Sequence, residues 1–233
     1  MNMNAFSLAF SFLMLSVFSL KAQMCSEMLE YYKINVELEY ISYDKKDKVG
    51  SRMNCKTLRT ETQNDTAIVW LNIRVYDNKN NETSQSDMPL KCYNDMLIMD
   101  MRSVMPAMPA NAQGSSDVRI EIKGDDMAFP PDAKAGQTLP DAEMEMTTYM
   151  GTMRLLSNKY AVRNRKVEGN ERVTTPAGDF DCVKYSYDFE YNFLGKRTSR
   201  TEYWLKPGLG MVKTISYDKK GAVESRMELT KIR

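Results

Sequence analysis

Apolar and polar side chains alternate with a period of two along most of the chain, and a helical stripe is almost absent. The clearest segment runs from Val183 to Phe193, where every second residue is valine or aromatic and the residues between are polar or charged. This alternation predicts a strand with one buried and one wet face. Eleven residues at ~3.3 Å each give a strand of roughly 36 Å, which must twist and coil.

The same alternation predicts strands elsewhere in the chain, and we therefore expect an all-β fold. The long strand favours a strongly curved antiparallel sheet or half-open barrel of roughly nine to eleven strands, with one short helical or loop lid. Residues 101–114 carry Pro106 and Pro109, so they can form only a short helical turn or an apolar loop. The other expected strands are Ile34–Tyr43, Val49–Glu61, Thr66–Tyr76, Met96–Met101, Val118–Ile122, Met144–Met150, Glu202–Leu205 and Met211–Tyr217.

One thirteen-residue pattern occurs twice, near the two ends of the chain. Ile41–Met53 and Ile215–Met227 share ten identical positions. In each copy an aspartate can accept hydrogen bonds from the backbone and start a tight turn, and the fourth turn residue, Asp47 or Gly221, tolerates a positive φ. We expect two β-hairpins that lie near each other in one sheet.

The chain is expected to be an exported protein with one folded domain. Residues 5–20 are apolar and uncharged, which is typical of a secretory signal peptide, so we assign residues 1–23 to the signal and 24–233 to a single β-domain. The long apolar run keeps a retained membrane anchor as an alternative. Acylation of Cys25, close behind the signal, is another.

Composition excludes several classes of function. The chain has no histidine, which removes the commonest general base and zinc ligand. Basic and acidic residues are evenly spread and equal in number once the signal is removed, so no nucleic-acid partner is expected. The sequence has no glycine-rich phosphate loop before a helix. We therefore expect no enzyme, no cofactor and no metal.

Methionine is the unusual residue, with nineteen in the chain and eleven of them between Met88 and Met153. Flexible thioether side chains suit a surface that adapts to apolar partners, although they also fill irregular cores. A copper(I) site is a sharper alternative, but residues three apart on a strand face opposite sides. The candidate ligand-binding residues are Met96, Met99, Met101, Met105, Met108, Met144, Met146 and Met150.

Four cysteines at wide spacing favour structural disulfides over a redox or zinc motif. We expect Cys25 to pair with Cys92, since a loose N-terminus gains most from being tied down, and leave Cys55 and Cys182 open. The triplet 65–67 is similar to an O-glycosylation signal of some Gram-negative envelopes, which makes Thr66 a candidate acceptor.

Several segments together resemble a known family. They are R-N-R-K-V-E-G-N-E-R-V-T-T-P-A-G-D-F-D-C at 163–182, G-Q-T-L-P-D-A at 136–142, W-L at 204–205, G-M-V-K at 210–213 and the two Y-D-K-K turns. The chain resembles the TapB-like family of secreted, uncharacterised Gram-negative envelope proteins. The resemblance implies a location in the periplasm or outer envelope. It also implies a curved sheet similar to the half-barrel of lipoprotein-carrier (LolA/LolB-like) proteins, and it supplies no catalytic residues.

Two functions fit these observations. The first is binding of a lipid, acyl chain or other apolar ligand on a methionine-rich concave face of the sheet. The second is a non-enzymatic envelope module with a filled core, which binds a protein partner through its surface or sheet edge.

Overall fold

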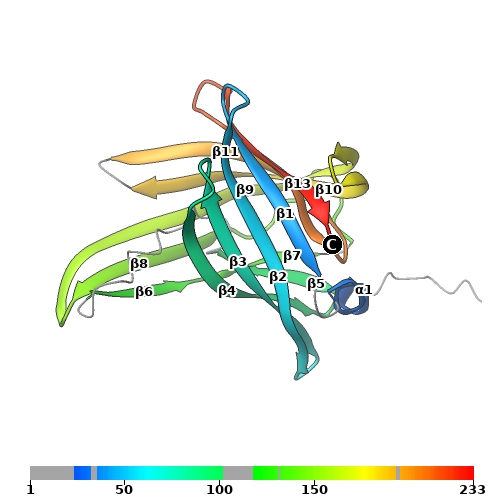
Figure 1. Cartoon of the computed structure of the whole chain (residues 1–233), viewed down its shortest axis with the longest axis horizontal. Coiled ribbons are helices and arrows are strands. Elements are labelled where there is room, and N and C mark those ends of the chain that lie inside the picture. Colours follow the sequence, from blue (N-terminus) through cyan, green and yellow to red (C-terminus); the bar gives the residue numbers. More distant parts are fainter. Residues whose placement is uncertain (1–23, 33–35, 102–117, 131, 193–194) are drawn as a thin grey trace, which may run out of the picture.

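The computed structural model describes residues 24–32, 36–101, 118–130, 132–192 and 195–233. They form one antiparallel sheet, curled into a nearly closed barrel, and one short helix (Figure 1). The helix is α1 (Met24–Tyr31), and the strands are β1 (Glu37–Asp44), β2 (Val49–Gln63), β3 (Thr66–Asp77), β4 (Glu82–Tyr93), β5 (Met96–Asp100), β6 (Val118–Gly124), β7 (Asp126–Phe129), β8 (Ala142–Met150), β9 (Met153–Thr175), β10 (Gly178–Asn192), β11 (Lys196–Lys206), β12 (Gly210–Tyr217) and β13 (Val223–Ile232).

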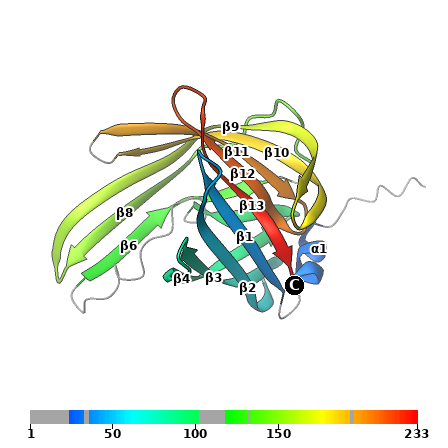
Figure 2. The same cartoon turned by 45° about the horizontal axis from the view of Figure 1, so that its top comes forward.

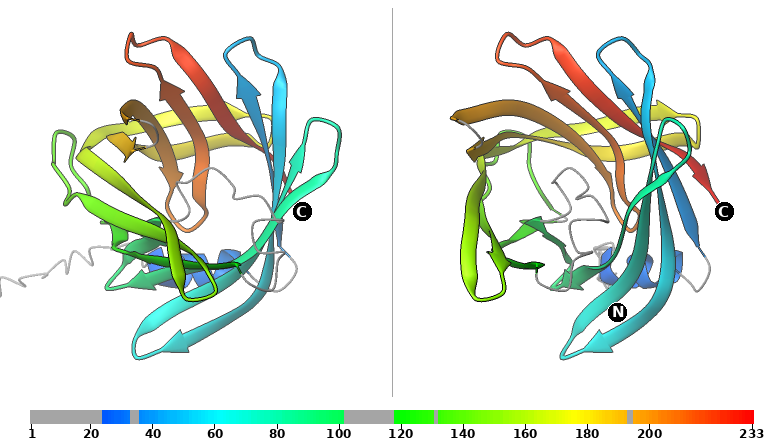
Figure 3. Two further views of the ribbon diagram at one scale, coloured as in Figure 1. Left: turned by 90° about the vertical axis from the view of Figure 1, so that its left-hand side faces the viewer. Right: turned by 60° about the vertical axis from the view of Figure 1, so that its left-hand side comes forward.

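The fold class is the one expected, and the described residues form thirteen strands, slightly more than the roughly nine to eleven expected. The strand order is β6-β8-β9-β10-β11-β12-β13-β1-β2-β3-β4-β5-β7, so the first and last strands of the chain are neighbours. Figure 3 looks along the barrel and shows the strands following one another around a ring. The barrel has one unsealed seam, between the edge strands β6 and β7, which only Asp125 separates in sequence.

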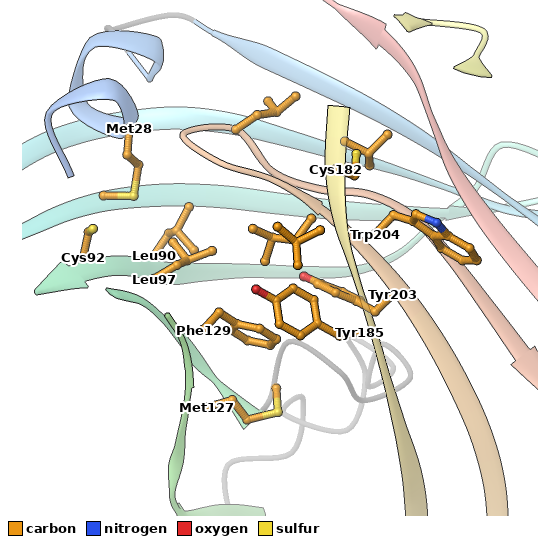
Figure 4. Packing of buried hydrophobic residues seen from close by; sticks show 14 of the residues in the cluster. Met28, Leu90, Cys92, Leu97, Met127, Phe129, Cys182, Tyr185, Tyr203 and Trp204 are labelled. Carbon is orange, nitrogen blue, oxygen red and sulfur yellow. The ribbon is translucent and has the colours of Figure 1, made fainter. Parts of the chain in front are cut away.

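The core fills the barrel with aliphatic, aromatic and sulfur-containing side chains. Phe129 of β7 lies edge-on to Tyr185 of β10, with ring centroids 5.1 Å apart, and stacks on Tyr203 of β11 at 5.8 Å. The Tyr203 hydroxyl also reaches the sulfur of Met99 on β5, 3.2 Å away. Figure 4 shows Phe129, Tyr185 and Tyr203 close together in the core. The interior at this level is therefore packed side chain against side chain.

Both copies of the repeated pattern are hairpins, as predicted. They are β1–β2 and β12–β13, and their turns lie side by side in Figures 1 and 2. Asp44 Oδ1 accepts hydrogen bonds from the amides of Lys46 and Lys48, and Asp218 Oδ1 makes the equivalent pair. The fourth turn residues, Asp47 and Gly221, have φ values of 59° and 79°.

A third turn, β3–β4, has the same construction. Asp77 Oδ1 accepts hydrogen bonds from the amides of Lys79 and Asn81, and Asn80 has a φ of 71°. Because antiparallel strands alternate in direction, these three turns and the β8–β9 turn lie at one end of the barrel.

The arginine of each repeated S-R-M segment ties its hairpin to the next one. Arg226 lies over the Tyr43 ring, with its Cζ 4.1 Å from the ring centroid, and its Nη1 contacts Asp47 Oδ1 at 2.8 Å. Arg52 likewise lies over the Tyr76 ring and donates a hydrogen bond to Asn80. Because the spacing is the same in both copies, each arginine is placed to contact the tyrosine and the turn of the neighbouring hairpin.

Helix α1 packs at the opposite end of the barrel, against β3, β4 and β5. A disulfide joins Cys25 to Cys92, as predicted, and closes a loop with a sequence separation of 67 residues. In the chain-entropy account a disulfide that closes such a loop raises the free energy of unfolding by on the order of 4 kcal/mol.

The short helix lies at the N-terminus of the described chain. The lid was expected near residues 101–114, which lie outside the described residues apart from Met101.

A buried arginine bridges the seam of the barrel. Arg165 of β9 is 4% exposed, and its Nη1 and Nη2 donate hydrogen bonds of 2.8 Å to the carbonyl oxygens of Pro140 and of Ala128 on the edge strand β7. Its Cζ lies 5.0 Å from the centroid of the Phe129 ring. In the described part of the chain no carboxylate lies within 4.0 Å of the guanidinium. Burial lowers its pKa, but an arginine remains charged at neutral pH.

Candidate functional site

Three of the candidate methionines belong to the packed core. Met101 is fully buried, Met144 is 3% exposed, and Met99 packs against the core cluster and contacts Tyr203. Met99 and Met144 lie in β5 and β8, and Met101 directly follows β5. Their burial means that they form the wall and floor of the barrel interior, and not an open surface.

The remaining candidates are distributed differently. Met96 and Met146 are half-buried, and Met150 is 52% exposed at the end of β8. Met105 and Met108 lie outside the described residues. Of the eight, Met146 and Met150 are thus the described methionines of β8 that lie beyond the core.

These two methionines belong to an arm that extends from the barrel, formed by β6, β8 and residues 153–160 of β9 (Figure 2). Directly opposed pairs place Met150 beside Val118, and Met146 beside Ile122. On the other side of β8, Met144 faces Tyr160. Opposed residues share a face, and successive side chains alternate, so one face of the arm continues the buried face of Met144.

This inner face of the arm is apolar and only partly covered. Its positions on β6 and on β8 beyond Met144 are half-buried or exposed, whereas Met144 is buried. Ile122 and Tyr160 still pack against the core cluster. The inner-face residues are Val118, Ile120, Ile122, Met144, Met146, Thr148, Met150, Leu156, Asn158 and Tyr160.

The opposite face of the arm is charged. Glu121 contacts Arg119 at 3.3 Å and Lys123 at 3.8 Å, and Glu145 contacts Arg154 at 3.2 Å. An edge strand with such charges is protected against pairing with another chain. The arm is therefore amphipathic, with a charged and polar outer face and an apolar inner face that continues into the core.

Two surface depressions also occur, and both are lined mainly by charged residues. One, of about 550 Å³, is shared by β6, β8, β9, β10 and the start of β11, with Arg163, Glu190 and Lys196 among its lining residues. The other, of about 610 Å³, lies beside the β12–β13 turn and includes Arg200 and Glu202. Neither resembles an apolar ligand cavity. Within the described ranges no group of three metal-ligating histidine, cysteine or carboxylate side chains is found.

The other candidate residues lie away from the arm. Cys55 and Cys182 are buried thiols, and burial raises the pKa of each to about 12. Thr66 is the first residue of β3 and is half-buried. Its glycosylation stays a prediction.

Sequence reasoning selected the methionines of the arm but missed its other apolar residues. Ile120 and Ile122 were in an expected strand, but nothing marked β6 as the partner of β8. Leu156 and Tyr160 fall in a segment rich in polar residues, which gives no clear alternation. The exposed pair Leu155-Leu156 next to Met153 was the available signal.

Two solved structures have a similar fold. A crystal structure from Bacteroides fragilis, described as a "putative exported protein with YmcC-like fold", has a TM-score of 0.71 at 19% identity and covers 86% of this chain and 96% of its own. A "putative lipoprotein" from Parabacteroides distasonis has a TM-score of 0.73 at 20% identity and covers 87% of this chain and 96% of its own. At these identities the likeness concerns the fold.

A search of curated proteins found no match to the chain. None of the described helices is long and apolar enough to cross a membrane. The narrower TapB-like name and the resemblance to lipoprotein carriers stay predictions. A sequence family matches residues 36–229, which span all the strands except the end of β13, and on this match the chain belongs to the DUF3108-like family.

Proposed function

We propose that this is an exported envelope protein that binds an acyl chain or another apolar ligand on the inner face of the arm. The observation that supports the proposal is the amphipathic arm, whose apolar face is half-exposed and continuous with the core. A soluble domain gains nothing from leaving such a face uncovered, and large uncovered apolar surfaces generally mark binding sites. The ligand would lie along Ile120, Ile122 and Met146, with Met144 and Tyr160 at its inner end.

Binding at this face rests on removing apolar surface from water, at ~25 cal/mol per Å². Few polar groups line it: Thr148 on β8 and Asn158 on β9. Selectivity is therefore expected to follow chain length and width more than headgroup chemistry. The deep methionines Met99 and Met101 would act as the closed end of the site and would not contact most of the ligand.

The envelope location and the absence of enzymatic activity are parts of the same proposal. The apolar run at residues 5–20 and the two fold relatives, described as an exported protein and a lipoprotein, support export. The chain has no histidine, the commonest general base, which supports a binding role over a catalytic one.

Organic extraction of the purified protein, followed by mass spectrometry, tests the ligand directly. We expect a co-purified lipid with wild type, and at least a fivefold smaller amount with the inner-face variant Ile120→Ser/Met146→Ser. The matched control, Lys123→Ser/Lys159→Ser, changes the outer face of the arm on β6 and β9 and should retain the lipid. Wild-type protein with no extractable lipid, and no binding of added cis-parinaric acid, would refute the proposal.

An envelope module with a filled core is the second candidate. The packing of Met99, Phe129 and Tyr203 across the barrel favours it, because this region leaves no room for a ligand. A crystal structure with the inner face of the arm covered by the chain itself, together with an empty lipid extract, would support this alternative.

A further inference from the structure

The tip of the arm, where β8 turns into β9, is unusually apolar for a turn. Met150, Met153, Leu155 and Leu156 are 52%, 66%, 48% and 49% exposed, and they are four of the nine large apolar side chains that are exposed in the described chain. The β1–β2, β3–β4 and β12–β13 turns at the same end of the barrel instead have the sequences D-K-K-D-K, D-N-K-N-N and D-K-K-G-A, which are almost entirely polar or small. Turn geometry therefore does not require these side chains.

Among the residues that the structure describes, the charges nearest the tip are both positive. The tip consists of residues 148–156 of the β8–β9 hairpin and the neighbouring residues 118–120 of β6. These residues include Arg119 and Arg154 and no acidic residue. Arg119 lies over the Tyr149 ring, with its Cζ 4.3 Å from the centroid, and both arginine side chains are 58% exposed. Their glutamate partners lie farther from the turn than the arginines, Glu121 by two positions along β6 and Glu145 by four positions along β8 from the residue opposite Arg154.

We infer that this tip docks onto an anionic lipid bilayer. Met150, Met153, Leu155 and Leu156 would enter the boundary between headgroups and acyl chains, and Arg119 and Arg154 would contact lipid phosphates. Tyr149 would lie at headgroup level, where amphipathic aromatic rings are favoured. Exposed apolar side chains backed by basic residues are the pattern of elements that bind in the membrane interface.

A bilayer fits this surface better than a protein partner does. The tip is the end of a single hairpin, whereas a stable protein interface generally needs ~800 Å² and 20 to 30 residues on each partner. Flexible methionine and leucine side chains also need no complementary shape in a fluid bilayer. The inference uses the proposed envelope location, but it does not require that the inner face of the arm binds a ligand.

Vesicle flotation tests the inference with the full mature chain. Large unilamellar vesicles of phosphatidylethanolamine and phosphatidylglycerol at 7:3 are compared with pure phosphatidylcholine. We expect wild type to float with the anionic vesicles, and Met150→Ser/Met153→Ser to lose at least tenfold in partition coefficient. The matched control is Val49→Ser/Val223→Ser, which removes two side chains of similar exposure, 47% and 44%, next to polar turns.

A second variant separates the electrostatic contribution. Arg119→Gln/Arg154→Gln should lower partitioning several-fold at low salt, with a smaller effect at high ionic strength, because screening weakens the attraction to phosphate. Wild type that stays with the unbound fraction overturns the inference. Equal partition coefficients for the tip variant and the control also overturn it. A third contrary result is a wild type that is a dimer in sedimentation velocity and a tip variant that alone is a monomer, because the tip would then be an interface between two copies of the chain.

The outcome is distinguishable from that of the proposed function. Lipid extraction reports on the inner face, through Ile120 and Met146, whereas flotation reports on the tip. Loss of flotation in Met150→Ser/Met153→Ser with an unchanged lipid content supports docking alone. A wild type that floats but contains no lipid retains the docking inference and removes the ligand-binding proposal.

Discussion

The buried arginine at the seam gives the sharpest test of how this barrel is held together. In Arg165→Met the side chain keeps much of its length and loses the guanidinium. The carbonyl oxygens of Pro140 and Ala128 then lose the donors that lie 2.8 Å away. The ring of Phe129 also loses the cation 5.0 Å from its centroid.

The expected cost follows from these contacts. A hydrogen bond that involves a charged group contributes about 1.5–3 kcal/mol, so the two from Arg165 give about 3–6 kcal/mol. The variant also avoids burying a guanidinium that has no carboxylate within 4.0 Å among the described residues, which offsets part of the loss. We therefore expect Arg165→Met to lower the free energy of unfolding by about 2–4 kcal/mol.

Equilibrium urea unfolding, followed by tryptophan fluorescence, measures this difference. Arg163→Met is the matched control two residues away: Arg163 is 33% exposed and pairs with Asp141 and Glu143 at the surface, so its loss should cost less than about 1 kcal/mol. Hydrogen exchange should show faster opening of β7 in Arg165→Met alone. Equal stability of the two variants, or protection of β7 unchanged in Arg165→Met, would refute the assignment of Arg165 to closure of the seam.

Three further predictions follow from burial and hydrogen bonding. Met144→Ala should lower the free energy of unfolding by about 2–5 kcal/mol, because Met144 is 3% exposed, whereas Met150→Ala at 52% exposure should change it by less than about 0.5 kcal/mol. Urea unfolding of both variants measures this contrast, and equal losses would contradict the assigned core. Cys55 and Cys182, each with its pKa raised to about 12 by burial, should not react with Ellman's reagent at pH 8 in the folded protein, and should give two thiols after unfolding without reductant. Hydrogen bonds from the backbone amides of Ala222 and Lys220 lower the pKa of Asp218, so this turn contributes stability above the ordinary aspartate pKa and loses it as the pH falls through the lowered value. Carbon-13 NMR titration should find Asp218 below the ordinary range in the wild type, and a normal pKa would contradict the turn geometry.

Local sequence signals predicted the parts of the fold that depend on local chemistry. The aspartates of the repeated turns lie where backbone amides need an acceptor, and the alternation from Val183 to Phe189 corresponds to the buried face of β10. The Cys25–Cys92 disulfide was predicted from the expected gain in tying down the N-terminus. These features need only a few neighbouring residues, or a single covalent link, to be specified.

The sequence was less informative where strands are irregular or polar. β9 has twenty-three residues and was missed, because Asn164, with a φ of 52°, and Gly169, with a φ of 136°, coincide with register shifts that break the alternation. β4 was missed because its outer positions are polar and Pro89 interrupts it. Arg165 looked like one more charge in a charged run, since nothing local shows that it reaches the carbonyls of another strand.

The pairing of the first strand with the last affects how the chain folds during its synthesis. Apart from β1–β13, every pair of neighbouring strands is adjacent or next but one in sequence, whereas Thr230 bonds to Glu39 across a separation of 191 residues. Two meanders can therefore form by local contacts, but they remain unjoined until β13 has been synthesised. Such non-local closure is slow and leaves open strand edges in the meantime. A nascent chain that lacks only its last ten residues exposes an edge on β1 and another on β12, so holdase chaperones are expected to recognise it until its final strand is complete.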